Sequence, residues 1–248
     1  MERSKYFIVW FLFFASVKGF ASYQEQIFSA YLTGDMDAWR HVIDRMESIE
    51  TKNARFTHNL INYQYGFIGY AIGVSDLKTA RLYLNLAKNN LQRLEEMNYN
   101  SSVIQSYKAA FYGFEIGLNR FRAPLYGPRS IDAAKQAMLL DNTNPIGFKQ
   151  YAHAQYYMPA IFGGSKTEAL EYYHTAEKIY ENNLHDAHRD WNYISLLVTI
   201  AQAYEELGNT SKAISYYEKI LSFAPGFTWV KNELYPSIKN KKKKKIKK

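Results

Sequence analysis

The sequence contains no cysteine among its 248 residues. Disulfide bonds, thiol nucleophiles and zinc sites with cysteine ligands are therefore excluded. The sequence also lacks a dinucleotide-binding glycine fingerprint, and none of its serines or lysines lies in a nucleophile motif. We therefore expect no catalytic residues and no cofactor.

One short segment imitates a phosphate-binding loop without meeting its requirements. In "GGSKT", Ser165 separates Gly164 from Lys166, whereas the motif needs glycine directly before the lysine. We interpret Ser165 as the cap of a helix, with Glu168 returning the hydrogen bond three residues later.

A metal site is the less favoured interpretation of the segment "HDAHRD". Its histidines, His185 and His188, can share one face of a helix, and Asp186 and Asp190 lie nearby. The segment precedes an expected helix, where polar residues serve as caps, and no third and fourth ligand cluster accompanies it. The remaining histidines are scattered along the chain: His41, His58, His153 and His174.

Excess positive charge is confined to the C-terminus. The formal net charge is +8, and the segment from Lys239 to Lys248 contains eight lysines, so the rest of the chain is close to neutral. This distribution argues against nucleic-acid binding by the fold. We expect the tail to be disordered because like charges repel, with at most weak contact to anionic surfaces.

Long apolar runs are also missing. The longest uncharged segment near the N-terminus, "YFIVWFLFFASV", covers twelve residues at 6–17 and follows Arg3 and Lys5. A membrane-spanning helix needs roughly 20 apolar residues, so the run is typical of a signal peptide, although an uncleaved anchor is the alternative. Gly19 and Ala21 predict cleavage before Ser22, which makes the protein periplasmic or secreted.

Two amphipathic helical patterns occupy the segment from Ile200 to Pro225. Apolar residues recur at helical spacing over 200–207 and again over 213–221. Between them Gly208 can adopt the left-handed conformation that ends a helix, and Asn209 can cap the next one. The segment therefore predicts an antiparallel helical hairpin whose remaining apolar edge requires a neighbour.

This hairpin resembles a tetratricopeptide repeat. The resemblance rests on Tyr204, Gly208, Ala213, Tyr217 and Pro225, which match the spacing of the family signature. Looser copies of the second half occur upstream at 75–91, 129–145 and 163–180, with a degenerate first copy near Gly34. Irregular distances between the copies indicate insertions at 121–130 and 158–168, which we expect to lengthen loops on one edge.

A second, less extensive resemblance concerns the loop "MPAIFGGSK". A proline followed by Phe-Gly-Gly before a repeat helix is similar to helical-repeat accessory subunits of tripartite periplasmic transporters. This resemblance implies a role in solute uptake.

The repeat resemblance implies an all-α, right-handed α-solenoid of about five antiparallel helix pairs with a C-terminal capping helix. We divide the chain into a signal peptide at 1–21, a repeat domain at 22–238 and a disordered tail at 239–248. Two expected first helices carry stripes of small residues, which we interpret as sites of close helix packing. These stripes are Gly66, Gly69 and Gly73, then Ala109, Gly113 and Gly117.

Stacked helix pairs present a concave surface, and this predicts a non-catalytic scaffold that binds a protein or peptide partner in the cell envelope. A small-ligand-binding or transporter-accessory module of the periplasm is the alternative, and the sequence leaves the oligomeric state open. The expected groove residues are amide, tyrosine and other polar side chains at helical spacing. They are Asn59, Asn62, Tyr112, Glu115, Asn119, Gln150, His153, Tyr157, Ser195, Gln202 and Glu206.

Overall fold

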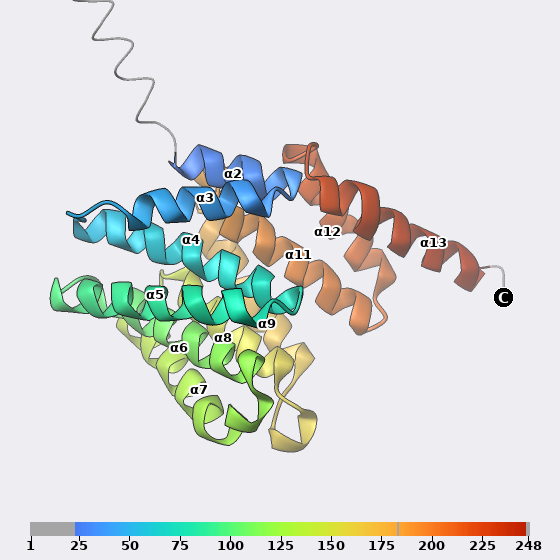
Figure 1. Ribbon diagram of the computed structural model, residues 1–248. Coiled ribbons are helices and arrows are strands. Elements are labelled where there is room, and N and C mark those ends of the chain that lie inside the picture. The colour runs from blue at the N-terminus through green and yellow to red at the C-terminus, as the bar shows by residue number, and fades with distance from the viewer. Residues whose placement is uncertain (1–22, 183, 247–248) are drawn as a thin grey trace, which may run out of the picture.

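The computed structural model describes residues 23–182 and 184–246, which form helices and turns and no strand. Ten α-helices make up five consecutive pairs, so the expected all-α array of about five pairs with a capping helix is confirmed (Figure 1). The pairs are α2 (Tyr23–Thr33) with α3 (Met36–Glu47), α4 (Ala54–Gly73) with α5 (Leu77–Glu96), α6 (Ser101–Leu118) with α7 (Ala123–Leu140), α8 (Pro145–Tyr157) with α9 (Lys166–Glu181), and α11 (Trp191–Glu206) with α12 (Thr210–Phe223). The short segments η1 (Arg120–Arg122) and η2 (Ala160–Phe162) lie within the third and fourth pairs, and α10 (Leu184–Ala187) lies between the fourth and the fifth. After the last pair, η3 (Val230–Leu234) leads into α13 (Tyr235–Ile246).

Three of the five pairs turn tightly by the same local chemistry. Gly34, Ser75 and Gly208 have positive φ angles, of 76°, 64° and 78°. Each is followed directly by an aspartate or asparagine whose side chain caps the next helix. The expected roles of Gly208 and Asn209 are confirmed, because Asn209 accepts a hydrogen bond from the backbone of Lys212.

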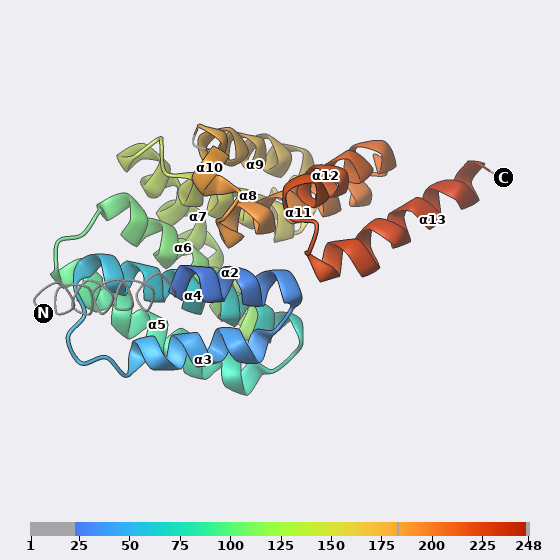
Figure 2. The ribbon, with the colours of Figure 1, turned by 90° about the horizontal axis from the view of Figure 1, so that it is seen from above.

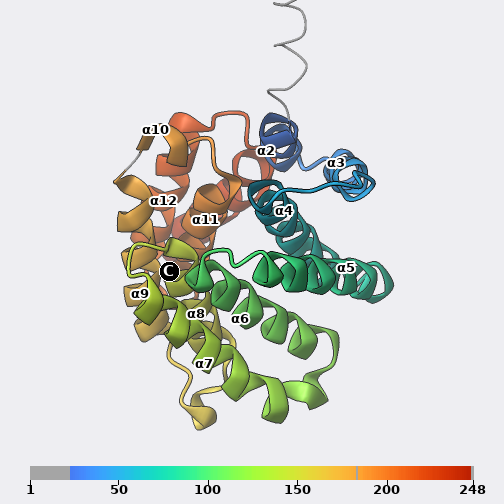
Figure 3. The ribbon, with the colours of Figure 1, turned by 90° about the vertical axis from the view of Figure 1, so that its left-hand side faces the viewer.

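The first helix of each pair lies inside the array and the second lies outside. Figure 3 shows α2, α4, α6, α8 and α11 grouped around the centre, with α3, α5, α7, α9 and α12 at the periphery. The array also curls until its N-terminal helix meets its C-terminal pair. Tyr31 on α2 packs against Phe227, with ring centroids 5.0 Å apart, and Thr228 donates a hydrogen bond to the carbonyl of Leu32.

Two large apolar clusters hold the array together. One joins α2 to α6 and includes Trp39, Ile68 and Tyr107, while the other joins α8 to α13 and includes Tyr173 and Tyr217. Between them, α6, α7 and α8 meet through a small cluster of alanines and Tyr151. Small side chains at this junction allow the helix backbones to approach closely.

The first expected insertion is shorter than the sequence suggests. Helix α7 begins at Ala123, so Pro124 lies in its first turn and Pro128 lies inside it. Proline is tolerated in the first turn because the amide hydrogens there have no partner within the helix. Of the first insertion, only the turn around η1 lies outside a helix pair's α-helices. The second insertion forms a loop around η2, as expected.

The cap at Ser165 forms as expected, with its hydroxyl accepting a hydrogen bond from the amide of Glu168 at 3.2 Å. The carboxylate of Glu168, however, accepts a bond from the hydroxyl of Tyr151. The side chain of Glu168, which was expected to complete the capping box, is therefore bonded to Tyr151 of α8 instead.

Helix α13 covers the end of the last pair and then leaves the body of the protein (Figure 2). Its buried contact is Ile238, and Lys241 pairs with Glu205 of α11 at 2.7 Å. The helix includes the first residues of the segment expected to be disordered. Lysine is a good helix former, so a helix started by α13 propagates into the lysine run, although a short helix without packing is marginal in water. Disorder of the tail in solution stays a prediction.

Candidate functional site

The inner face of the array is closed at one end by aromatic rings. Trp191, at the start of α11, contacts Tyr31 of α2, Trp39 of α3 and Tyr65 of α4, with ring centroids 5.1 to 6.0 Å away. The indole N–H of Trp191 is buried and has no hydrogen-bond partner among the described residues, so packing holds this ring in place. We call this region the closed end.

Gly66 shows how tightly the closed end is packed. A Cβ atom at this position would lie 2.7 Å from Trp39 and 2.8 Å from Trp191, closer than side chains can approach. The close approach inferred from the glycine stripe is therefore real at Gly66. It is also present at Gly117, where a Cβ atom would lie 3.3 Å from Ile72.

A buried lysine lies beside these rings. Lys149 of α8 is only 1% exposed, and its Nζ lies 5.2 Å from the ring centroid of Tyr65 and 5.5 Å from that of Trp191. It donates one hydrogen bond, to Asn192 Oδ1 at 3.2 Å. Burial lowers the pKa of Lys149 to about 8, against the opposing effect of Asp190. The closed end thus contains a cation held mainly by aromatic faces.

Three of the expected groove residues belong to this closed end. Asn62 accepts a hydrogen bond from Asn192 at 2.7 Å, Gln150 donates to the hydroxyl of Tyr65 at 3.1 Å, and Ser195 is hydrogen-bonded to Tyr31. Their polar groups tie inner helices to one another. They are therefore engaged within the fold rather than presented to a partner.

The same helices become exposed toward their C-terminal ends. On α8, Tyr157 is 74% exposed, with the ring of His153 next to it. On α11, Gln202 is half-buried and Glu206 is exposed, pairing with Lys166. We call this region, together with the exposed glycines of α4 and α6 described next, the open end.

Glycines form the α4 and α6 sides of the open end. Gly69, Gly73, Gly113 and Gly117 are all exposed. Gly113 and Gly117 continue the side of α6 that carries Ser106, to which Asn144 at the start of α8 donates a hydrogen bond. Nothing lies within 4 Å of a Cβ atom added at Gly73 or Gly113. Packing within the described residues therefore does not account for a mid-helix glycine at position 113, which costs about 1 kcal/mol.

Four expected groove residues point away from this face or lie at its margin. Tyr112 stacks on Tyr126 of α7, and Glu115 is buried between Lys88 and Arg122. The pKa of Glu115 is lowered, because the two cations outweigh the effect of burial. The residues predicted from the sequence to line the groove on α6 therefore lie on a neighbouring face of that helix.

The other two of the four are exposed. Asn119 is exposed and caps η1, and Asn59 is exposed near the start of α4. His153, in contrast, lies on the expected face, but its Nδ1 is 2.6 Å from the hydroxyl of Tyr173, and burial lowers its pKa to about 3.

Sequence reasoning missed Lys149 and the ring of Trp191. In "GFKQYAHAQYY" the lysine looks like an ordinary surface residue at a polar position of a helix. Its burial depends on Trp191 and Tyr65, which are far away in the sequence. The glycine stripes were the available signal, and they were assigned to helix packing at every position.

A second polar cluster ties α9 to α11 and α12. The carboxylate of Glu177 accepts hydrogen bonds from Tyr216 and Lys219 and contacts His174, over distances of 2.6 to 2.9 Å. His174 in turn contacts the hydroxyl of Tyr204. Every member has partners within the cluster, so its role in this arrangement is to join adjacent repeats.

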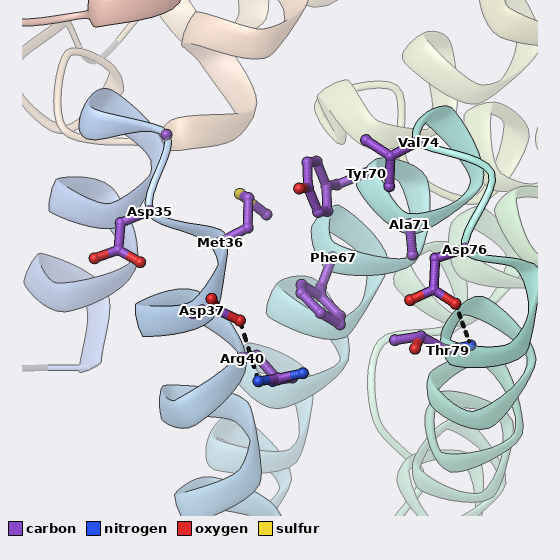
Figure 4. Close-up of a pocket in the computed structure, with 11 residues that line it drawn as sticks. Asp35, Met36, Asp37, Arg40, Phe67, Tyr70, Ala71, Val74, Asp76 and Thr79 are labelled. Carbon is purple, nitrogen blue, oxygen red and sulfur yellow. Dashed lines mark hydrogen bonds and ion pairs between the residues drawn. The ribbon is translucent and has the colours of Figure 1, made fainter.

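The outer side of the array contains a hollow of about 310 Å³ between α3, α4 and α5. Figure 4 shows Phe67 and Tyr70 at its back and Asp37 paired with Arg40 at its rim. Asp76 caps α5 by accepting a bond from the amide of Thr79. These charged groups are already paired, and the hollow is separate from the inner face.

Among the described residues, no group of three or more histidine or acidic side chains is arranged to hold a metal ion. His185 is exposed and contacts Asp186, while His188 stacks on Phe223 with ring centroids 4.1 Å apart. No helix in the described part of the chain is long and apolar enough to cross a membrane.

Residues 194–227, which contain most of α11 and all of α12, match the tetratricopeptide repeat family. The chain carries a tetratricopeptide repeat. The resemblance seen at Tyr204, Gly208 and Pro225 is thereby confirmed. Repeats of this kind form scaffolds that are typical of protein-interaction modules and are generally not catalytic.

Solved structures share the fold of most of the chain. The HusA haemophore from Porphyromonas gingivalis superposes with a TM-score of 0.57 at 18% identity, covering 75% of this chain and 94% of its own. TTC0263, a thermophilic TPR protein from Thermus thermophilus, gives 0.54 at 17% identity and covers 85% and 93%. No curated protein matches the chain. The resemblance to transporter accessory subunits stays a prediction.

Proposed function

We propose that this protein is a non-catalytic, exported helical-repeat scaffold that binds a protein or peptide partner at the open end of its inner face. The observation that carries the proposal is the exposed glycine at position 113. Glycine at this position destabilises the helix, and no packing within the fold offsets that loss. Close approach of a bound chain to the glycine backbone would offset it. Exposed Tyr157 adds a rigid contact surface beside this site.

Capture of envelope proteins by the chain from Ser22 onward, followed by mass spectrometry, identifies the partner. Gly113→Leu then fills the open end, and we expect it to abolish capture while leaving helicity intact. Gly127→Leu is the matched control, because a Cβ atom there also meets open space but the residue lies on the outer helix α7. Equal capture by both variants would move the binding surface away from the inner face.

The tyrosines provide a second comparison. Tyr157→Ala should weaken partner binding by about 1–3 kcal/mol, as for an exposed aromatic anchor. Tyr112→Ala, on the side of α6 that faces α7, should leave affinity unchanged. Weaker binding by both variants would support the groove as the sequence stripe placed it, because that stripe contains both tyrosines.

Export is part of the proposal, and it is supported by the charged start and the short apolar run. The expected leader at 1–21 lies outside the described residues. Mass measurement of the protein from its native host should give a chain beginning at Ser22. A chain that retains Met1 in the membrane fraction would contradict it.

A small ligand is the second candidate occupant of the open end, as in a ligand-binding or transporter-accessory module. The neighbour described as a haemophore shares the fold, and here an exposed tyrosine lies next to a histidine, two residue types that can ligate haem iron. Titration with haem, followed by absorbance, tests it. Saturable binding that Tyr157→Phe removes would favour this candidate over a peptide.

A further inference from the structure

The turns within the helix pairs all lie along one edge of the array, which we call the turn edge. Three of them are tight and capped by Asp35, Asp76 and Asn209. The turns of the third and fourth pairs instead contain the short segments η1 and η2. These two turns are therefore longer than the three tight turns, and they extend outward from the array.

The side chains at these two turns are apolar and face solvent. Phe121 in η1 is 95% exposed, and Ile161 and Phe162 in η2 are 86% and 71% exposed. Leu125, one turn into α7, is also about half exposed. A single exposed apolar residue is ordinary, but a group of them marks an interaction surface.

The two turns lie near each other on the molecule. Figures 1 and 3 place both at the lower end of the array, where α6 continues into α7 and α8 continues into α9. Packing between α7 and α8, including Lys135 over the ring of Tyr151, holds the two pairs together. The two turns with exposed apolar residues thus project from the same end of the array.

The surroundings of these residues are basic. No aspartate or glutamate occurs between Glu115 and Asp132 or between Asp141 and Glu168. Glu115 is buried under Arg122, while Arg120 and Arg129 are exposed and form no ion pair within the described part of the chain. Lys166, which follows η2, pairs with Glu206 of α11.

The lysine-rich helix α13 projects from the same edge. In Figures 1 and 2, α13 extends past the ends of the other helices on the side of the turns. Its sequence carries Lys239 and the run of lysines from Lys241 to Lys245. Two basic features that are distant in the sequence therefore face the same direction.

We propose that the turn edge docks on an anionic lipid surface. Phe121, Ile161 and Phe162 enter the headgroup region, and the arginines and the lysine tail contact the lipid phosphates. The chemistry matches that of interfacial membrane-binding segments, which combine apolar side chains with a basic surround. A lipid surface accommodates separate projecting tips, whereas a protein partner would need a matching pocket for each.

Binding to vesicles tests this inference independently of any protein partner. The chain from Ser22 to Lys248 contains all the described helices and omits the apolar leader, which would insert by itself. We expect it to co-sediment with vesicles of equal parts phosphatidylglycerol and phosphatidylcholine, and to bind pure phosphatidylcholine about tenfold or more weakly. The triple variant Phe121→Ser, Ile161→Ser, Phe162→Ser should lose about tenfold or more of the binding to anionic vesicles.

A matched control exists on the opposite edge. Leu139 and Leu140 are also exposed, at the C-terminal end of α7. Leu139→Ser with Leu140→Ser should change vesicle binding by less than about twofold. In a second measurement, Phe121→Trp should show a blue shift of fluorescence on vesicles, and Leu139→Trp should not.

Three outcomes would overturn the proposal. The first is no binding to anionic vesicles, and the second is equal binding by the wild type and the triple variant with helicity preserved. The third is a dimer in solution that the triple variant dissociates, without vesicle binding, which would assign the turn edge to a second copy of this chain.

Discussion

Along the inner face, the middle of α4 and the N-terminal parts of α8 and α11 carry large rings and a buried lysine, whereas the C-terminal parts of these helices carry glycine, amides and an exposed tyrosine. At the closed end, Gly66 is required because Trp39 and Trp191 occupy the space of a side chain. At the open end, Gly113 faces empty space. The same residue type therefore serves packing in one region and leaves a surface accessible in the other.

This difference also affects polar groups. The side chains of Asn62, Gln150 and Asn192 form hydrogen bonds between inner helices. Gln202 and Glu206 remain partly or fully exposed. Closure of the array at one end thus determines which polar residues of a repeat are left for binding.

The largest expected effect is the loss of the ring that closes the inner face. Trp191→Ala removes contacts to α2, α3 and α4 and should lower the free energy of unfolding by about 3–5 kcal/mol. Trp229→Ala, at a partly exposed ring outside the closed end, should cost far less. Urea unfolding of both variants measures the difference. Equal losses would mean that Trp191 does not close the array.

The next effect concerns the charge of Lys149. Its pKa is lowered to about 8 in the fold and returns to 10.5 in the unfolded chain. Between these values the unfolded state binds more protons, so stability rises with pH. Stability therefore increases by about 3 kcal/mol in total as the pH rises from below 8 to above 10.5, because the fold no longer has to bury a charged lysine.

Lys149→Met isolates this contribution, because methionine fills a similar volume without a charge. We expect the variant to exceed the wild type in stability at pH 7, and the gap to narrow as the pH rises above 8. Urea unfolding across this pH range measures it. A gap that is constant with pH would show that the fold does not lower the pKa of Lys149.

Two glycine substitutions should have opposite signs. Gly66→Ala forces a methyl group against two tryptophan rings and should cost about 1–3 kcal/mol. Gly113→Ala adds a methyl group to open space and should stabilise the helix by about 0.5–1 kcal/mol. Thermal unfolding compares them directly. A loss at both positions would mean that the open end is packed more tightly than described.

The smallest effect is expected at the C-terminus. Truncation before Lys239 removes the exposed pair between Lys241 and Glu205, and such pairs contribute little. The free energy of unfolding should change by less than about 0.5 kcal/mol. A large drop in melting temperature would instead assign a structural role to the part of α13 that begins at Lys239.

Much of the fold was readable from local sequence. Gly208, Asn209 and Pro225 delimit the last hairpin, and Ser165 caps α9 as its position predicted. The groove was harder to place: the polar stripe at Tyr112 and Glu115 has the right helical spacing, but α7 and Lys88 take that side of α6. Periodicity shows that a helix has a polar stripe, and it does not show which neighbouring helix covers that stripe.

By itself the sequence determined the helices, their pairing and their turns, because caps, left-handed glycines and apolar spacing act over a few residues. Only the tertiary structure decided that the array curls until Tyr31 and Trp39 meet Trp191. That contact joins segments more than a hundred residues apart, and it depends on small rotations summed over successive pairs. It buries Lys149, closes one end of the inner face and leaves the glycine-lined end open.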